Sequence, residues 1–327
     1  MNHLLELIHQ SDNIVLSTHK QCDGDGLGAQ LAMYHALKSN TKKNVHVINL
    51  DHTPRKYKFL NPDQHIQYFE SNPQLPKKID LVLIFDTNDE RLLYPMFHDF
   101  KKATDQVAFV DHHPALTIGP SPTKLSWIDT SCASTGEMAY QLIKALKYKF
   151  NAAVAECIYT SITFDTQLYR FIRNSPNSHL IAAEMLSHKV PVQEIHRHLF
   201  GQQTVAKMNF LAEALHGIEY FQNGRIAMVR LKLKDILRYG LEPEDSRDVI
   251  DMIMNIENLE AAALFREDID SEFKMSLRSK GRVGVLQIAE SMGGGGHMFA
   301  SGAYVKGPYE EIKNSVLNGL IKMLNHG

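Results

Sequence analysis

Four short runs of almost unbroken apolar residues dominate the first third of the chain. They are NIVLST (13–18), VHVINL (45–50), IDLVLIF (79–85) and QVAFV (106–110). Such runs are typical of parallel strands that helices cover on both faces. The stretches between them, GLGAQLAMYHALKSN and DERLLYPMFHDFKKA, have the apolar spacing of helices. This alternation predicts an α/β fold with a doubly wound parallel sheet.

The pattern changes near residue 190. Helical stretches lead up to Pro191, and one long connecting helix is expected to run to about Gly217. Beyond it, RIAMVRLKL, LEAAALFRED and EFKMSLRSK alternate like strands, and a helix VGVLQIAESM, the sequence GGGGH and a terminal helix near 309–325 follow. We therefore predict an N-terminal domain (1–190), a helical linker (191–217) and a smaller α/β domain with a mixed sheet (218–327).

The composition argues against several classes of protein. With 44% hydrophobic and 22% charged residues, the chain is typical of a globular protein, and no apolar run approaches the ~18 residues that span a bilayer. The net charge is −2 and no basic stripe is visible, which argues against the binding of long duplex nucleic acid. The three cysteines, Cys22, Cys132 and Cys157, show no paired spacing, which predicts a reducing, cytoplasmic setting.

Metal-type ligands follow three of the four apolar runs. They are His19, Asp23 and Asp25 after the first, Asp86 after the third, and Asp111, His112 and His113 after the fourth. A single Asp after a strand commonly caps the next helix, and a His pair arises easily among 17 histidines. However, the carboxyl ends of parallel strands meet at one edge, where several carboxylates are costly without cations between them. The set therefore predicts a metal centre.

The ligand types indicate which metal this centre would hold. Carboxylates with few imidazoles and no usable thiolate favour Mn²⁺ or Mg²⁺. More than four candidate ligands indicate two ions, ~3.5–4 Å apart, that share a bridging carboxylate and activate a hydroxide. Such a pair predicts phosphoester hydrolysis, and without a basic stripe the substrate is expected to be short.

A second motif, MGGGGHMFASG, occupies residues 292–302. Its consecutive glycines can expose backbone N–H groups to an anion, as phosphate-binding nests do, or they can form a flexible turn. Arg278 and Arg282 in SLRSKGR are suited to phosphate, although an Arg on a strand is more often a surface residue.

These motifs together resemble a known family. HKQCDGDG, FDTND, VDHH and SITFDT, followed by SLRS and GGGGHMFASGA, are similar to DHH-family phosphoesterases with a DHH-associated C-terminal domain. Within that family they most resemble the nanoRNase branch of oligoribonucleases and pAp phosphatases. The resemblance spans nearly the whole chain. It implies a cytoplasmic Mn²⁺-dependent enzyme that hydrolyses dinucleotides and other short RNA to mononucleotides and pAp to AMP, acts on neither long duplexes nor membranes, and often forms homodimers.

The resemblance also implies a role for each matched residue. The first metal ion would be held by His19, Asp23 and Asp86, and the second by Asp25, Asp86, His112 and Asp165. The implied catalytic set is Asp86, Asp111, His112 and His113, in which Asp111 orients the ligands and His113 faces the scissile phosphate. The implied substrate-binding set is Arg278, Ser279, Gly294, Gly295, Gly296 and His297.

Two departures from the family pattern leave the ligands intact but the substrate preference open. Cys22 stands where the family usually has Pro, and Gln167 stands where it has Gly. Nearby Tyr169 and Phe171 either stack on a base or belong to the core. Two alternative functions therefore remain: a signalling phosphodiesterase for cyclic or linear dinucleotides, and a non-catalytic nucleotide sensor.

Overall fold

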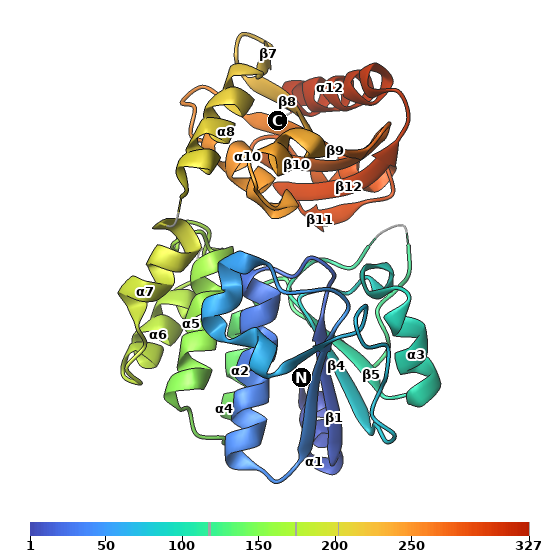
Figure 1. Ribbon diagram of the computed structural model, residues 1–327, viewed down its shortest axis with the longest axis vertical. Coiled ribbons are helices and arrows are strands. Elements are labelled where there is room, and N and C mark those ends of the chain that lie inside the picture. The colour runs from blue at the N-terminus through green and yellow to red at the C-terminus, as the bar shows by residue number, and fades with distance from the viewer. Residues whose placement is uncertain (117–118, 174, 202, 327) are drawn as a thin grey trace. The chain divides into compact units, whose positions relative to one another are not determined.

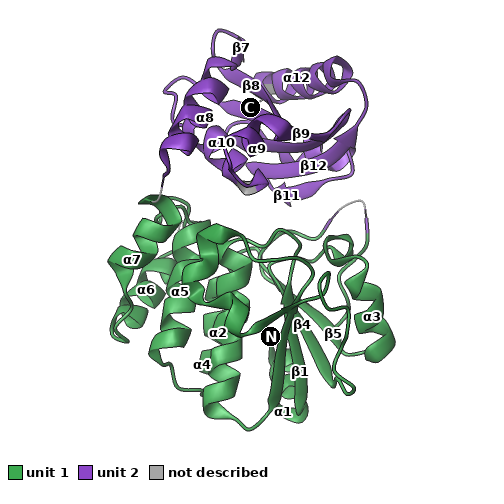
Figure 2. Cartoon of the chain, viewed as in Figure 1, with its two compact units in different colours: residues 1–115, 120–202 green, residues 116–119, 203–327 purple. Residues whose placement is uncertain are grey.

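The computed structural model describes residues 1–116, 119–173, 175–201 and 203–326, and the chain divides into two compact units (Figures 1 and 2). Unit 1 comprises residues 1–115 and 120–202, and unit 2 comprises residues 116–119 and 203–327. Each unit contains its own six-stranded sheet.

The sheet of unit 1 is parallel throughout. Its strands are β1 (Asn13–Thr18), β2 (Asn44–Asn49), β3 (Ile66–Tyr68), β4 (Leu81–Phe85), β5 (Val107–Asp111) and β6 (Trp127–Ile128). Their order is β3-β2-β1-β4-β5-β6, so the connections reverse direction between β1 and β4. Ligands of open α/β sheets bind at such a switch point, outside the carboxyl ends of the strands. The prediction of a doubly wound parallel sheet is confirmed.

Helices cover both faces of this sheet (Figure 1). α1 (Asn2–Gln10), α2 (Gly24–Asn40), α4 (Thr135–Ala145), α5 (Ala152–Asp165) and α6 (Asn177–Leu186) pack on one face. α3 (Met96–Ala103) packs on the other. Along β1, Ile14 and Leu16 face the first group of helices and Val15 faces the second, as expected of a strand buried on both sides.

Two predicted helices are broken. The stretch 89–103 forms a 3₁₀ turn (Glu90–Leu93) and then α3, because Pro95 between them has no N–H to continue a helix. The expected connecting helix 191–217 is also wrong. It consists of α7 (Val192–His196), a π-helical turn (Arg197–Gly201) and α8 (Val205–His216). The side chain of Thr204 accepts from the Lys207 N–H at the start of α8, so a new helix begins there.

The sheet of unit 2 is mixed, as predicted. Its strands are β7 (Glu219–Phe221), β8 (Ile226–Lys232), β9 (Ala261–Ile269), β10 (Glu272–Ser279), β11 (Gly295–His297) and β12 (Ala300–Lys306), in the order β11-β12-β10-β9-β8-β7. β8 and β9 are parallel and the other pairs antiparallel. α11 (Leu286–Ser291) and α12 (Tyr309–His326) pack on one face, and α8, α9 (Leu233–Arg238) and α10 (Arg247–Ile253) on the other.

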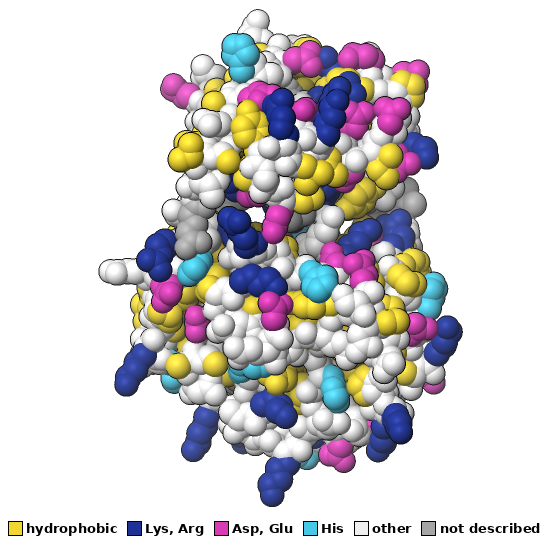
Figure 3. All heavy atoms as spheres, viewed as in Figure 1, with side chains coloured by type: hydrophobic (Ala, Val, Ile, Leu, Met, Phe, Trp, Pro, Cys, Tyr) yellow, Lys and Arg dark blue, Asp and Glu magenta, His cyan; other side chains and the backbone are white. Residues whose placement is uncertain are grey.

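The charges on the surface and the character of the helices agree with the near-neutral, mixed composition of the chain. On the face drawn in Figure 3, basic side chains are interspersed with acidic ones. Among the described residues, no helix has the length and apolar character that crossing a membrane requires.

Candidate metal centre and substrate-binding residues

His19 lies just beyond β1 and presents one ring nitrogen to two carboxylates. Its Nδ1 donates to the carbonyl oxygen of Lys20 at 2.8 Å, because a carbonyl can only accept, and this leaves Nε2 facing the carboxylates. Nε2 lies 3.5 Å from Oδ2 of Asp86 and 4.0 Å from Oδ1 of Asp23. An imidazole nitrogen and two carboxylate oxygens arranged in this way are a suitable set of ligands for a cation.

The glycine-rich segment after His19 is the first turn of α2 rather than an open loop. Asp23 caps this helix by accepting from the N–H groups of Asp25 and Gly26. A Cβ on Gly26 would lie 2.3 Å from Oγ1 of Thr18, and one on Gly28 would lie 2.7 Å from the carbonyl oxygen of Cys157. These glycines let α2 pack closely on β1 and α5.

Asp25 is buried and held by three donors from two other helices. Its Oδ2 accepts from the N–H of Thr135 at 2.8 Å, and its Oδ1 accepts from the N–H of Gly136 at 3.1 Å and from the hydroxyl of Ser161. Thr135 and Gly136 begin α4, so the positive end of that helix faces the carboxylate. These contacts fix the carboxylate in position.

Asp86 follows β4 and faces ligands on both sides. Its φ of 63° is left-handed, a conformation that Asp tolerates better than most residues. Its Oδ2 faces His19, whereas its Oδ1 lies 3.8 Å from Nε2 of His112 and accepts from Oγ1 of Thr135 at 3.0 Å. One carboxylate oxygen of Asp86 therefore faces His19 and the other faces His112, as expected of a carboxylate that bridges two metal ions.

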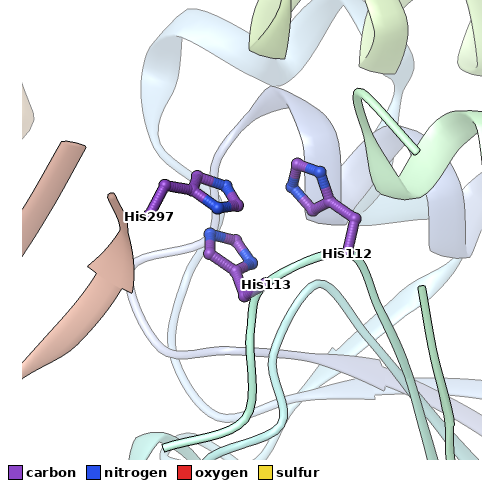
Figure 4. Close-up of side chains that lie close together, drawn as sticks. All are labelled: His112, His113 and His297. Carbon is purple, nitrogen blue, oxygen red and sulfur yellow. The ribbon is translucent and has the colours of Figure 1, made fainter. Parts of the chain in front are cut away.

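His112, which follows β5 (Figure 4), repeats the arrangement of His19. Its Nδ1 donates to the carbonyl oxygen of Cys132 at 3.3 Å. Its Nε2 lies 3.5 Å from Oδ2 of Asp25 and 3.5 Å from Oδ2 of Asp165. Asp165 is the last residue of α5. The second imidazole therefore also presents Nε2 to carboxylates.

Asp111 and His113 form a pair next to these ligands. Nδ1 of His113 donates to Oδ1 of Asp111 at 2.8 Å and lies 3.7 Å from Oδ1 of Asp86. The side-chain amide of Asn88 donates to Oδ2 of Asp111 at 2.6 Å and to the carbonyl oxygen of His113 at 3.1 Å. Asp111 therefore fixes the orientation of the His113 ring.

The electrostatics match a site built for cations. Burial raises the pKa of Asp25 well above its usual range, and the charges of Asp86 and Asp165 raise it further. Burial and the nearby Asp23 likewise raise the pKa of Asp86. Burial, helped by the positive charge of His113, lowers the pKa of His112 to about 3. Mutually repelling carboxylates and a neutral imidazole are a donor set that divalent cations stabilise.

His113 differs from His112 in the effect of its neighbours. Although burial works against its protonation, Asp111 outweighs this effect and raises the pKa of His113 to about 10. The pKa of Asp111 itself is lowered, because the positive charge and hydrogen bonds of His113 outweigh burial.

The structure thus brings together in unit 1 every metal ligand and catalytic residue expected from the sequence. Ligand atoms within 4.8 Å of one another form the groups His19, Asp23, Asp86; Asp25, Asp86, His112; and Asp86, Asp111, His113. Asp86 is common to all of them, and oxygen ligands with a few imidazole nitrogens fit Mn²⁺ or Mg²⁺. Sequence reasoning missed the residues that hold these ligands, Asn88, Thr135, Gly136 and Ser161, because each acts through another side chain.

The segment after Asp165 shows why a glycine would suit the position of Gln167. This residue has a φ of 48°, and Leu168 and Tyr169 are also left-handed at 61° and 63°, so the chain takes here the conformation that favours glycine. Tyr169 stacks on His179 with ring centroids 5.0 Å apart and belongs to the packing of unit 1. Phe171 is 55% exposed.

The substrate-binding residues expected from the sequence lie at one end of the sheet of unit 2. Arg278 is paired with Ala300 across β10 and β12, and Ala300 with His297 across β12 and β11. Directly opposite residues point to the same face of a sheet, so Arg278 and His297 share a face. Ser279 follows Arg278, and its Oγ accepts from the N–H groups of Gly281 and Val283.

The first glycines of this motif lie in a hydrogen-bonded turn after α11, and the next ones form the short strand β11. The N–H groups of Gly293 and Gly294 donate to Glu290 and Ala289 at the end of α11, and residues 295–297 form β11. A Cβ on Gly294 would lie 2.0 Å from the carbonyl oxygen of Gly302, so close packing accounts for this glycine. Because β11 is an edge strand, alternate N–H groups along it point away from β12.

The comparisons with known proteins agree with this arrangement. The family model described as "DHH family, N-terminal domain" matches residues 13–162, and the DHHA1 domain model matches residues 223–325. Proteins named bifunctional oligoribonuclease and PAP phosphatase NrnA are 29% identical in Thermus thermophilus (94% of this chain, 90% of the relative) and 27% identical in Bacillus subtilis (92% of both). The crystal structure of an exopolyphosphatase-related protein from Bacteroides fragilis shares the fold, with a TM-score of 0.87 and 24% identity over 99% of this chain and 96% of that chain. The chain therefore belongs to the DHH family of phosphoesterases, with a DHH domain followed by a DHHA1 domain, and is a hydrolase.

Proposed function

We propose that this hydrolase cleaves short oligoribonucleotides, including dinucleotides, to mononucleotides and removes the 3′-phosphate of pAp to give AMP. The observation that carries the proposal is the pair of ligand groups sharing Asp86, with Nε2 of His19 on one side and Nε2 of His112 on the other. The names of the Thermus and Bacillus relatives support the choice of substrate.

We propose Mn²⁺ as the metal, with His19, Asp23 and Asp86 for one ion and Asp25, Asp86, His112 and Asp165 for the other. When bound, the ions supply Lewis acidity to the phosphoryl oxygens and lower the pKa of the attacking water. Asp111 accepts from Nδ1 of His113 and so directs Nε2 away from itself, and its charge raises the pKa of the ring, which favours the protonated form. As the P–O bond breaks, the departing ribose oxygen would take the Nε2 proton, and the proton lost by the attacking water would restore the protonated ring.

We assign the remaining roles by position. Residues 1–190 form the catalytic domain, 191–217 the linker and 218–327 the substrate-binding domain, in which Arg278, Ser279, Gly294, Gly295, Gly296 and His297 hold a terminal phosphate of the substrate. Because its N–H is engaged at the end of α11, Gly294 serves by permitting close packing. A cytoplasmic location, supported by three buried free cysteines, and a homodimer complete the proposal.

The test is a time course of the full chain with Mn²⁺ on 5′-labelled RNAs of two to about seven nucleotides, with pAp alongside. We expect fast loss of the dinucleotide and of pAp, and slow loss of longer chains. Asp86→Asn, which removes the shared charge, is expected to abolish turnover. Rapid cleavage of long strands with the dinucleotide left intact would contradict the short-substrate proposal. Turnover of cyclic dinucleotides alone would favour the signalling alternative.

A further inference from the structure

A two-residue turn, Met298–Phe299, joins β11 to β12 in unit 2. His297 and Ala300 pair on either side of it. Both turn side chains are large and apolar, yet Met298 is 49% exposed and Phe299 is 42% exposed. Among the described residues, neither belongs to the apolar cores on the two faces of this sheet. The apolar cores of unit 2 therefore do not account for two such residues at this turn.

The turn is nevertheless firmly held. The carbonyl oxygen of Met298 accepts from the N–H of Val285 at 2.8 Å, and that of Phe299 accepts from the N–H of Ser279 at 2.9 Å. Both backbone anchors come from outside the hairpin, so the apolar side chains are displayed from a fixed backbone. A surface ordered in advance loses less conformational entropy when it binds.

The turn also adjoins the cationic residues of this end of the sheet. Arg278, Ala300 and His297 form one row across β10, β12 and β11, and Ser279, which holds Phe299 in place, is the next residue after Arg278. A guanidinium and an imidazole suit a phosphate, but they cannot distinguish a nucleotide from a sugar phosphate. Phe299 is the next residue along the chain from Ala300 in this row, and an aromatic ring carried by this turn can supply the missing contact, because every nucleobase has a flat apolar face.

On the basis of the proposed function, we infer that Phe299, with Met298 beside it, binds the base of the nucleotide whose terminal phosphate is held by Arg278 and His297. Stacking on one aromatic ring tolerates any base, which suits an enzyme acting on short RNA of any sequence. Phe299 is thus a specificity-determining residue that favours nucleotides over phosphate esters lacking a base.

The test compares two ligands that differ only in the base, AMP and ribose 5-phosphate. Their dissociation constants for the full chain with Mn²⁺ are measured by calorimetry, and their inhibition constants against the dinucleotide pApA by kinetics. The wild-type chain is expected to bind AMP about 5- to 100-fold more tightly than ribose 5-phosphate. Phe299→Ala is expected to abolish this ratio by weakening AMP alone, and to raise KM for pApA with little change in kcat. Phe299→Trp is expected to restore the ratio.

A matched control is Tyr304→Ala, which removes another exposed aromatic ring from β12 and is expected to leave the ratio unchanged. The inference is overturned if Phe299→Ala weakens both ligands equally or neither, or if it changes only the oligomeric state, which would make the turn an interface between copies. If wild-type protein does not cleave pApA, the proposed function fails, and the calorimetric ratio still decides the role of Phe299.

Discussion

Replacing Ser161 with alanine tests how Asp25 is held as a metal ligand. The buried Ser161 hydroxyl is one of three donors to this carboxylate, beside the N–H groups of Thr135 and Gly136. A hydrogen bond to a charged group contributes about 1.5–3 kcal/mol, and partners that orient a metal ligand typically account for 10- to 100-fold in metal affinity. We therefore expect Ser161→Ala to weaken Mn²⁺ binding by about 10- to 100-fold.

Unit 1 offers a closely matched control at Ser178. Its hydroxyl is also fully buried and also donates to a buried carboxylate, that of Glu137, which accepts in addition from the N–H of Ala133. Glu137 belongs to none of the candidate ligand groups. Ser178→Ala should therefore lower the free energy of unfolding by a similar amount, about 1–3 kcal/mol, without changing the affinity for Mn²⁺.

The assay combines Mn²⁺ titration calorimetry with chemical unfolding, with and without Mn²⁺. At saturating Mn²⁺, each tenfold loss of affinity removes about 1.4 kcal/mol of the stabilisation that the metal adds. This loss is expected in Ser161→Ala alone. Unchanged Mn²⁺ affinity in Ser161→Ala, or an equal loss in both variants, would refute the reasoning that the Ser161 contact positions a metal ligand.

Two further predictions concern stability. The side-chain amide and the backbone N–H of Asn13 donate to Asp80, and these hydrogen bonds are the main cause that lowers the pKa of Asp80 to about 2. Because the pKa is lower in the folded than in the unfolded state, the ionised carboxylate stabilises the fold above pH ~4, the pKa of the unfolded state. This contribution disappears as the pH falls towards 2. Asp80→Ala should thus lower the free energy of unfolding by about 1–2 kcal/mol at pH 7. Unfolding followed by circular dichroism at a series of acid pH values should show the difference in stability from wild type disappearing near pH 2. A difference that stays constant with pH would contradict this prediction. In unit 2, Nζ of the buried Lys207 lies 2.6 Å from a carboxylate oxygen of both Asp245 and Asp248. Lys207→Met leaves these two carboxylates without this cation and should lower the free energy of unfolding, measured in urea, by about 3 kcal/mol. A loss below about 0.5 kcal/mol would show that these ion pairs contribute no more than surface contacts.

The arrangement of unit 1 could be predicted from the sequence because its signal is local. The apolar runs mark β1, β2, β4 and β5 to within about two residues, and the rule that ligands gather at the carboxyl ends of parallel strands places Asp86 and His112 on one edge. The break in the helix expected after residue 190 was missed, although GQQT at 201–204 carries no apolar side chain, because apolar residues at helical spacing resume at Val205.

The contacts that hold the site could not be predicted, because they join residues distant in the sequence. Ser161 is 136 residues from Asp25, and Thr135 is 49 residues from Asp86. Serine and threonine at these positions look like ordinary helix residues until the fold brings the carboxylates to them. Asp165 is a similar case, since it ends a helix rather than a strand and only the family resemblance pointed to it.

The role of a glycine is hard to predict from the sequence for a different physical reason. A glycine signals either a backbone conformation that other residues avoid or a neighbour too close for a side chain, and the sequence does not separate the two. At Gly26, Gly28 and Gly294 the second reason holds, because a Cβ would meet another atom within 2.7 Å. The first reason holds at Gly293 and Gly296, whose φ angles are 80° and 130°, and left-handed conformations also occur at non-glycine residues such as Gln21 and Gln167.

Asp86 shows how the local backbone conformation and contacts with residues distant in the sequence combine at the centre of the site. A residue at the end of a central parallel strand normally continues outward or caps the next helix, but the left-handed backbone of Asp86 turns its carboxylate so that Oδ2 faces His19 and Oδ1 faces His112. The hydrogen bond from Thr135 then fixes Oδ1. The N–H of Thr135 also donates to Asp25, so one residue at the start of α4 contacts a carboxylate of each ligand group. We conclude that Thr135 contributes to the spacing of the two ligand groups by anchoring Asp25 and Asp86 to the same helix terminus.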